Sequence, residues 1–196
     1  KALELNIEKL KIEEKRNVPL NLASVLMNIG IVYAFQEEYP KALEYYRQAD
    51  SIIQSNNVKK LKYNIALNTG DTYDRLNLSD SAFRYFILSL DLARQDEDDD
   101  LIGTSMTGLG HSYRKMGRFK ESMEHYEAAI GYLKAAGDDE MLCETTLGLA
   151  RLFEETKQYD SASHYATLSL NVAKSGKFLS KELDAAQFLT DHYKKI

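Results

Sequence analysis

The sequence predicts an all-α fold, a solenoid of antiparallel helix pairs with about ten helices. Three observations carry this prediction. The chain repeats with a fixed period of about 40 residues. Each repeat places apolar residues at the three- and four-residue spacing of a helix face. The 196 residues include only two prolines and ten glycines, so few residues interrupt helices.

The period is clearest in a column of small residues, each followed three positions later by an aromatic residue. The pair recurs once per period, at Gly30 and Tyr33, Gly70 and Tyr73, Gly110 and Tyr113, Ala150 and Phe153, and Thr190 and Tyr193. Gly costs about 0.5–1 kcal/mol relative to Ala inside a helix. Its recurrence therefore predicts close approach by a neighbouring helix. The aromatic residue is expected to fill the gap between repeats.

The second half of each repeat has columns of its own. Small residues share one position, at Ala42, Ala82, Ser122 and Ala162, and are the expected counterpart of the Gly column. Aromatic residues share another, at Tyr46, Phe86 and Tyr126, which Ala166 breaks. A further small column holds Ala49, Ser89, Ala129 and Ser169.

Each repeat is predicted to hold two helices, roughly residues 20–36 and 40–55 in the first one. Polar breaks rich in Ser, Asn, Asp and Gly separate the repeats, as in "SNNVKK" and "AAGDDE". We expect a single solenoid over residues 1–196. Its parts are the second helix of a preceding repeat, four full repeats, and the first helix of a following one: 1–18, 19–58, 59–98, 99–138, 139–178 and 179–196. The half repeats and the absence of an initial Met suggest a piece of a longer protein.

These columns resemble the tetratricopeptide repeat, whose signature places a large residue, Leu-Gly and Tyr on the first helix and Ala, an aromatic residue and Ala on the second. The first repeat matches with Leu26, Ile29, Gly30, Tyr33, Ala42, Tyr46 and Ala49. The resemblance implies a right-handed superhelical solenoid. The usual repeat of this family is shorter, at about 34 residues. The longer form found here looks like the repeats of bacterial regulators and kinesin light chains. The residue pattern of segments such as "KALEYY" is most similar to the sensor regions of bacterial two-component or transcriptional regulators.

Composition and motifs exclude several functions. A net charge of -5 argues against nucleic-acid binding, and no apolar run approaches the roughly 20 residues that span a bilayer. No nucleophile or phosphate-binding motif occurs, so neither catalysis nor a cofactor is expected. The acidic stretch at 96–100 lacks the later residues of a calcium loop and is interpreted as a helix-capping turn. No histidines have the spacing of a metal pair, so a solvated or partly packed state is expected for His111, His125, His164 and His192.

The resemblance implies that the first helices line a concave groove, through the columns of residues 24, 27, 28, 31, 34 and 35. The expected partner-binding residues are Met27, Asn28, Ile31, Phe35, Asn64, Asn68, Asp71, Arg75, Thr107, His111, Lys115, Arg151 and Glu155. Asn side chains can donate to and accept from an extended peptide backbone. The chemistry of these columns varies between repeats, as a specific groove requires and as neutral drift would also produce.

The sequence therefore favours a non-enzymatic module that binds a protein or peptide in the groove, as the sensory or regulatory region of a larger bacterial regulator. The alternative is an architectural scaffold or self-association module without a peptide ligand, and homo-oligomers remain open. No nucleic acid or membrane contact is expected for this segment. The sequence itself does not identify the compartment; resemblance to envelope-anchored sensors favours the bacterial periplasm, with the cytoplasm as the alternative.

Overall fold

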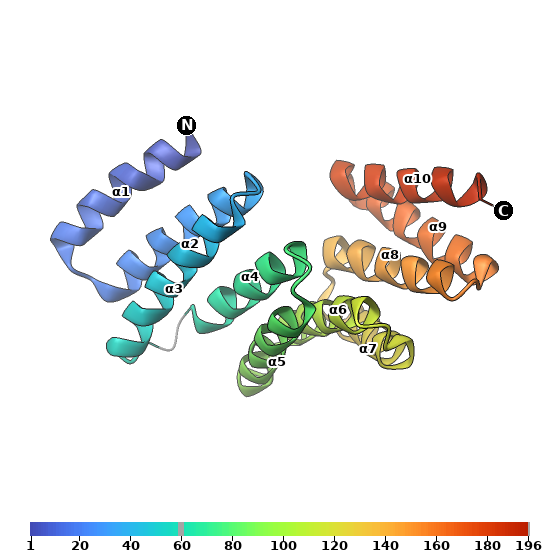
Figure 1. The fold of residues 1–196 in the computed structure, drawn as a ribbon, viewed down its shortest axis with the longest axis horizontal. Coiled ribbons are helices and arrows are strands. Elements are labelled where there is room, and N and C mark those ends of the chain that lie inside the picture. The colour runs from blue at the N-terminus through green and yellow to red at the C-terminus, as the bar shows by residue number, and fades with distance from the viewer. Residues whose placement is uncertain (59–60, 196) are drawn as a thin grey trace. The chain divides into compact units, whose positions relative to one another are not determined.

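A computed structural model of the chain describes residues 1–58 and 61–195. These residues form ten α-helices and no strand, which confirms the predicted all-α fold (Figure 1). The helices are α1 (Ala2–Arg16), α2 (Pro19–Phe35), α3 (Tyr39–Ser55), α4 (Lys62–Arg75), α5 (Ser79–Gln95), α6 (Asp99–Lys115), α7 (Phe119–Ala136), α8 (Asp139–Glu155), α9 (Tyr159–Gly176) and α10 (Leu179–Tyr193).

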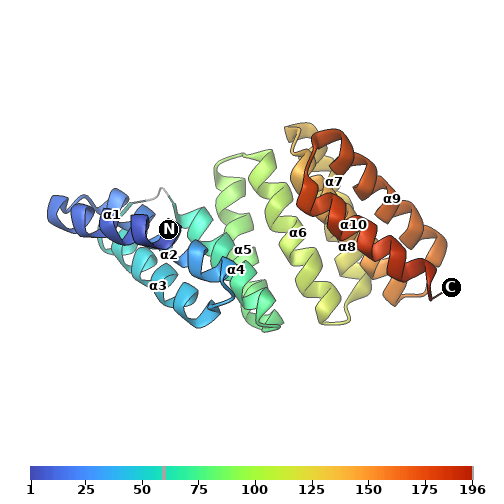
Figure 2. The same ribbon diagram turned by 90° about the horizontal axis from the view of Figure 1, so that it is seen from above.

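The chain divides into an N-terminal unit, residues 1–92, and a C-terminal unit, residues 93–196. In the N-terminal unit α1, α2 and α3 pack in sequence order, and α2 and α3 each contact α4 (Figure 1). In the C-terminal unit each helix from α6 to α10 packs against the next, and α8 also contacts α6 and α10. Figure 2 shows α8, α9 and α10 side by side from a second direction. The even-numbered helices, which begin each repeat, are called first helices below, and the odd-numbered ones second helices.

The Gly column permits close approach, and the ring that uses the space belongs to the aromatic column of the second helix. A Cβ atom added to Gly30 would lie 2.5 Å from Cε1 of Tyr46, and Gly70 and Gly110 face Phe86 and Tyr126 in the same way. The small column lies close as well, because the Ser122 hydroxyl donates to the Gly110 carbonyl oxygen at 2.8 Å. The prediction that the small column is the counterpart of Gly30 was therefore incomplete, because the ring of Tyr46 fills the space beside Gly30.

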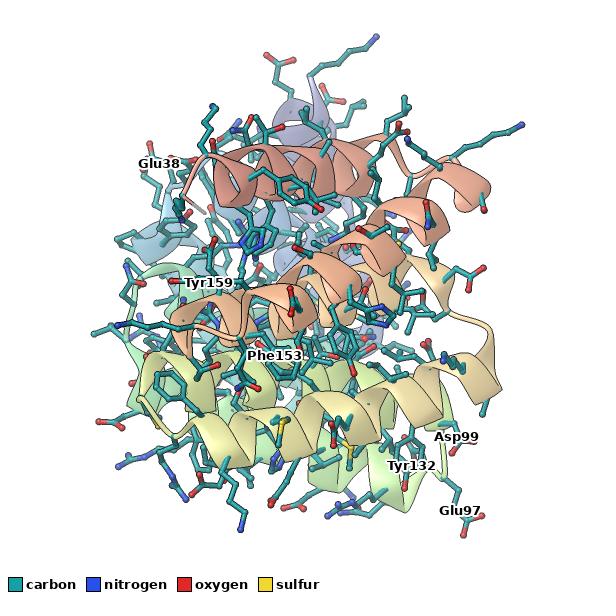
Figure 3. All side chains as sticks on the ribbon, turned by 90° about the vertical axis from the view of Figure 1, so that its right-hand side faces the viewer. Glu38, Glu97, Asp99, Tyr132, Phe153 and Tyr159 are labelled. Carbon is teal, nitrogen blue, oxygen red and sulfur yellow. The ribbon has the colours of Figure 1, made fainter. Side chains whose placement is uncertain are left out.

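The aromatic residue that follows the Gly column stacks within its own helix pair. Tyr33 stacks on Tyr45 with ring centroids 5.5 Å apart, and the same contact recurs between Tyr73 and Tyr85 and between Phe153 and Tyr165. Figure 3, which views the C-terminal unit, labels Phe153 among the side chains of α8 and α9. The sequence predicted that this aromatic column fills the gap between repeats. It did not predict the stacking partner on the second helix of the same repeat.

Each turn between the described helices contains a residue in the left-handed region. Its φ is positive at Asn17, Glu37, Asn57, Asn77, Glu97, Gly117, Gly137, Lys157 and Lys177. Within a helix pair the carbonyl of the stacked aromatic residue then accepts the hydrogen bond that closes the helix, as from Glu38 N to Tyr33 O at 2.9 Å. The acidic turn behaves as expected, because the Asp98 carboxylate accepts from Leu101 N at the start of α6.

Candidate functional site

A pocket lies between α2 and α4 in the N-terminal unit and brings together five of the predicted groove residues. Its volume is about 150 Å³. The predicted residues that line it are Ile31, Phe35, Asn68, Asp71 and Arg75. We call this the first-helix pocket. Tyr46 forms part of its wall, so the packing residue that fills the space of Gly30 also borders the site.

The first-helix pocket combines an exposed aromatic side chain with charges of both signs. Phe35 at the end of α2 is 84% exposed, which is unusual for so large an apolar side chain. Asp71 and Arg75 lie one turn apart on α4, and Glu37 adds a second carboxylate. This arrangement can hold an apolar side chain and a charged group of a ligand at the same time.

The remaining predicted residues of the N-terminal unit differ in how much surface they offer. Asn64 is exposed and Asn28 is half-buried. Asn68 donates its side-chain amide to the Asn64 carbonyl oxygen at 2.8 Å, which leaves its own oxygen for a ligand. Met27 is buried in the hydrophobic core cluster with Leu26 and Ile65, so its side chain contributes little to the surface.

The equivalent face of the C-terminal unit is closed by contacts between its own side chains. Thr107 is 2% exposed and shares a hydrogen bond of 2.7 Å with Thr145 of α8. His111 contacts Tyr126, with 2.7 Å between Nδ1 and the hydroxyl, and its Nε2 lies 3.7 Å from Glu144. Lys181 of α10 donates to the other oxygen of Glu144. These contacts tie α6 to α8 and α8 to α10.

Glu144 is the central charge of this chain of contacts. His111 and the ammonium of Lys181 hold the pKa of its carboxyl well below the usual range. At 3.7 Å the His111 contact is long for a hydrogen bond, so Lys181 is the firmer partner. Nearby, Arg114 forms an ion pair with Glu155, so the carboxylate of this predicted binding residue is already engaged. Arg151 and Lys115 are exposed.

Sequence reasoning named Thr107, His111 and Glu155 but missed the other residues that make these ties. Glu144 shares the column of Asn64, while Arg114 and Glu154 share the column of residue 34. These columns were expected to face the groove, so their charged members were the available signal. The expected solvated or partly packed state is wrong for His192, which is fully buried, with Nδ1 3.1 Å from Glu154 and Nε2 2.9 Å from the Ser163 hydroxyl. The ring of Tyr159, which is labelled in Figure 3, packs near the ring of His192.

The described side chains also bear on metal binding, thiolate chemistry and membrane spanning. Within residues 1–58 and 61–195, no group of three or more His, Cys, Asp or Glu side chains is arranged to hold a metal ion. The Cys143 thiol is buried, which raises its pKa to about 11 and opposes thiolate chemistry. None of the described helices combines the length and apolarity needed to cross a membrane.

Comparison with known protein families matches the description "Tetratricopeptide repeat" over residues 62–135 and 101–175, and again over residues 22–49. The chain belongs to the tetratricopeptide repeat family. This confirms the resemblance drawn from the Gly and aromatic columns, and it agrees with the helix pairs described above.

Among curated proteins, the chain is similar to the transcriptional activator NprA of Geobacillus stearothermophilus. The two are 27% identical over 184 residues, which is 85% of this chain and 43% of NprA. It is 23% identical over 128 residues to response regulator aspartate phosphatase A of Bacillus subtilis, covering 65% of this chain and 32% of that protein. The chain thus spans less than half the length of these relatives.

Among solved structures, the chain resembles NprR in complex with its cognate peptide NprX. The TM-score is 0.75 at 17% identity, over 96% of this chain and 56% of NprR. At this identity the likeness shows a shared fold. Together with the curated relatives, it places the chain among tetratricopeptide regions like those of bacterial regulators.

Proposed function

We propose that this chain is a protein- or peptide-binding module that regulates the output of a larger bacterial signalling or transcription protein. The observation that carries the proposal is the first-helix pocket, which Phe35, Asp71 and Arg75 line. The pocket lies on the face of the first helices where the binding groove is predicted. The names of the relatives, a transcriptional activator and a peptide-bound NprR, support the same function.

The ligand we propose is an extended peptide segment along α2 and α4. Asn28 and Asn64 hydrogen-bond its backbone, Phe35 contacts an apolar side chain, and Arg75 contacts a carboxylate. Ile31, Asn68 and Asp71 border the same path, whereas Met27 supports it from the core. No nucleic acid is part of this proposal, because the chain carries a net charge of -5.

The experiment is capture of the partner by the full-length protein. Asn28→Ala with Asn64→Ala, and Arg75→Glu separately, should each reduce capture and signalling output by about tenfold or more. The control is Arg84→Glu, which makes the same charge change at an exposed position of α5. Unaltered capture and output in both groove variants would refute the groove assignment.

We propose further that the chain has no catalytic activity of its own. The only thiol is buried with a raised pKa, and His111 is engaged by Tyr126 and Glu144. One relative is called a phosphatase, so the sharpest test is loss of phosphate from a phosphorylated receiver domain. The chain should leave that rate unchanged, and acceleration would contradict the proposal.

A second candidate is self-association, which the exposed apolar side chains of α10 favour. Leu179 is 77% exposed and Leu183 is 68% exposed on one face of that helix. Light scattering on the full-length protein and on this chain tests the idea. A dimer in both, lost on Leu183→Ser, would support an architectural role, whereas a monomeric full-length protein would refute it.

A further inference from the structure

A second cavity lies in the N-terminal unit, between α3 and α5, with α4 as its floor. Its volume is about 520 Å³, and among the described residues it shares only Tyr46 with the first-helix pocket. We call it the second-helix cavity. Its size falls within the roughly 300–1,000 Å³ typical of small-molecule sites.

Two residues of α4 in the floor of the second-helix cavity are smaller than their equivalents in α2 and α6. Thr69 stands where α2, α6 and α8 have fully buried Ile29, Leu109 and Leu149. Ala66 stands where α2 and α6 have Leu26 and Met106. Protein interiors are normally close-packed, so missing volume at two adjacent core positions leaves an open space. The smaller residues of the second repeat therefore contribute to this cavity.

The wall that α5 contributes is apolar. Leu88 and Leu92 line it, and Leu88 remains 47% exposed. Beside them the ring of Tyr85 stacks on Tyr73 of α4, with centroids 5.5 Å apart. Ile65 of α4 adds apolar surface to the floor. This half of the cavity suits an aliphatic or aromatic group.

The wall that α3 contributes carries charges of both signs. Glu44, Arg47 and Asp50 follow one another at three-residue spacing and all line the cavity. Asp50 accepts a hydrogen bond from Gln54, and its carboxyl is partly removed from water. This burial raises the pKa of Asp50, although the charge of Lys62 lowers it. A ligand cation beside Asp50 would compensate for the hydration that the carboxylate has lost.

We propose that the second-helix cavity binds a small amphipathic zwitterion of about the size of an apolar dipeptide. Its apolar body lies along Leu88 and Leu92, its ammonium faces Asp50, and its carboxylate faces Arg47, whose planar guanidinium matches that geometry. Such a ligand uses the apolar wall together with one carboxylate and the guanidinium of the opposite wall. This site is separate from the proposed peptide groove and does not depend on it.

The first test fills the cavity with the residues of the third repeat, Met106 and Leu109. Calorimetric titration of the chain with the dipeptide Leu-Phe should show binding, and Ala66→Met with Thr69→Leu should weaken it at least about tenfold. The same substitutions at exposed positions, Ala128→Met with Thr190→Leu, are the matched control and should bind as wild type does. The filled protein should keep its helix content and unfold at the same or a higher temperature, because it gains buried apolar volume. Absence of binding to the wild type at millimolar dipeptide, or unchanged binding in the filled variant, would overturn the proposal.

The second test separates the two charges without touching the core. Asp50→Asn should weaken binding of Leu-Phe and of Leu-Phe amide by about tenfold and leave N-acetyl-Leu-Phe unaffected. Arg47→Gln should weaken binding of Leu-Phe and N-acetyl-Leu-Phe and leave the amide unaffected. If the acetylated and amidated dipeptides bind wild type as tightly as free Leu-Phe, the site recognises apolar groups alone and the zwitterion proposal fails.

Discussion

Gly30 is the residue at which packing and the two cavities meet. The absence of its side chain lets the ring of Tyr46 lie directly against α2. Tyr46 is 2% exposed and lines both the first-helix pocket and the second-helix cavity. Burial raises the pKa of its hydroxyl to about 12, even though a hydrogen bond with Thr72 acts in the opposite direction. The position of this ring therefore sets the wall between two candidate sites.

Substitution of Gly30 by Ala should destabilise the protein despite the higher helix propensity of Ala. The new methyl group would lie 2.5 Å from Tyr46 Cε1, and forced repacking of a core typically costs about 1–3 kcal/mol. Gly131→Ala is the control, because nothing lies within 4 Å of a Cβ atom there. It should gain about 0.5–1 kcal/mol from helix propensity alone. Urea unfolding of the two variants measures both values, and equal signs would contradict this account of the Gly column.

At the scale of elements, the turns contain strain that the sequence relieves at only some positions. Glu37, Asn77, Gly117 and Lys157 occupy equivalent turns within the helix pairs, and each has a positive φ. A residue with a Cβ atom loses roughly 1–2 kcal/mol in this region, whereas Gly adopts it freely. Only the third repeat uses Gly at this position.

Lys157→Gly should therefore stabilise the C-terminal unit. We expect a gain of up to about 1 kcal/mol in the free energy of unfolding, the strain relieved less the chain entropy that Gly loses. Gln158→Gly at the next residue, where φ is -95°, is the control and should destabilise. Thermal unfolding compares the two, and a loss of stability in Lys157→Gly would mean that the left-handed turn is not strained.

The tie between α6, α8 and α10 should make stability depend on pH through Glu144. Its pKa is lower in the folded protein than the ordinary value of 4.5, so its contribution is fully present above about pH 4.5 and is lost as the pH falls further. Glu144→Gln should lower the free energy of unfolding by about 1 kcal/mol or less near neutrality, the range for partly exposed ion pairs. The gap to wild type should narrow in acid. Glu127→Gln, at an exposed position of α7, should show no such narrowing, and a gap that stays constant to about pH 3 would refute the assignment.

Helix boundaries were largely predictable because each follows from a local signal. The apolar spacing and the polar breaks predicted a first helix near residue 20 and another after each further period. The helices α2, α6, α8 and α10 begin on that period, at Pro19, Asp99, Asp139 and Leu179. α4 departs from it and begins at Lys62 after a left-handed Leu61. The repeat alone could not predict this shift, because the columns of the second repeat stay in phase.

The second-helix cavity was only partly predictable. The smaller Thr69 and Ala66 were visible in the sequence as departures from their columns. The cavity they leave, however, depends on how α3 and α5 stand around α4. A column of residue types records volume at each position, but it does not record whether neighbouring helices close over a missing side chain.

At the scale of the whole molecule, the first-helix faces of the two units differ although one column pattern describes both. In the N-terminal unit the predicted residues Phe35 and Arg75 line a pocket. In the C-terminal unit the equivalent columns form contacts between successive first helices, such as His111 with Glu144 and Arg114 with Glu155. The period identified the columns, but which members pair across successive helices depends on side-chain reach. Sequence reasoning therefore predicted candidate positions without separating binding surface from internal support.

Two arginines allow this division to be tested with matched substitutions. Arg75 is exposed at the first-helix pocket, whereas Arg114 is largely buried and bonds Glu155 and Tyr126. Arg75→Ala should reduce partner capture by the full-length protein about tenfold and change the free energy of unfolding by less than about 0.5 kcal/mol. Arg114→Ala should cost about 1.5–3 kcal/mol of stability, because it removes hydrogen bonds of a charged group, and should leave capture per folded molecule unchanged. Urea unfolding and quantitative capture on the same preparations give both readouts. If Arg114→Ala abolishes capture while stability is retained, the C-terminal face binds the partner directly, and the division between the units is wrong.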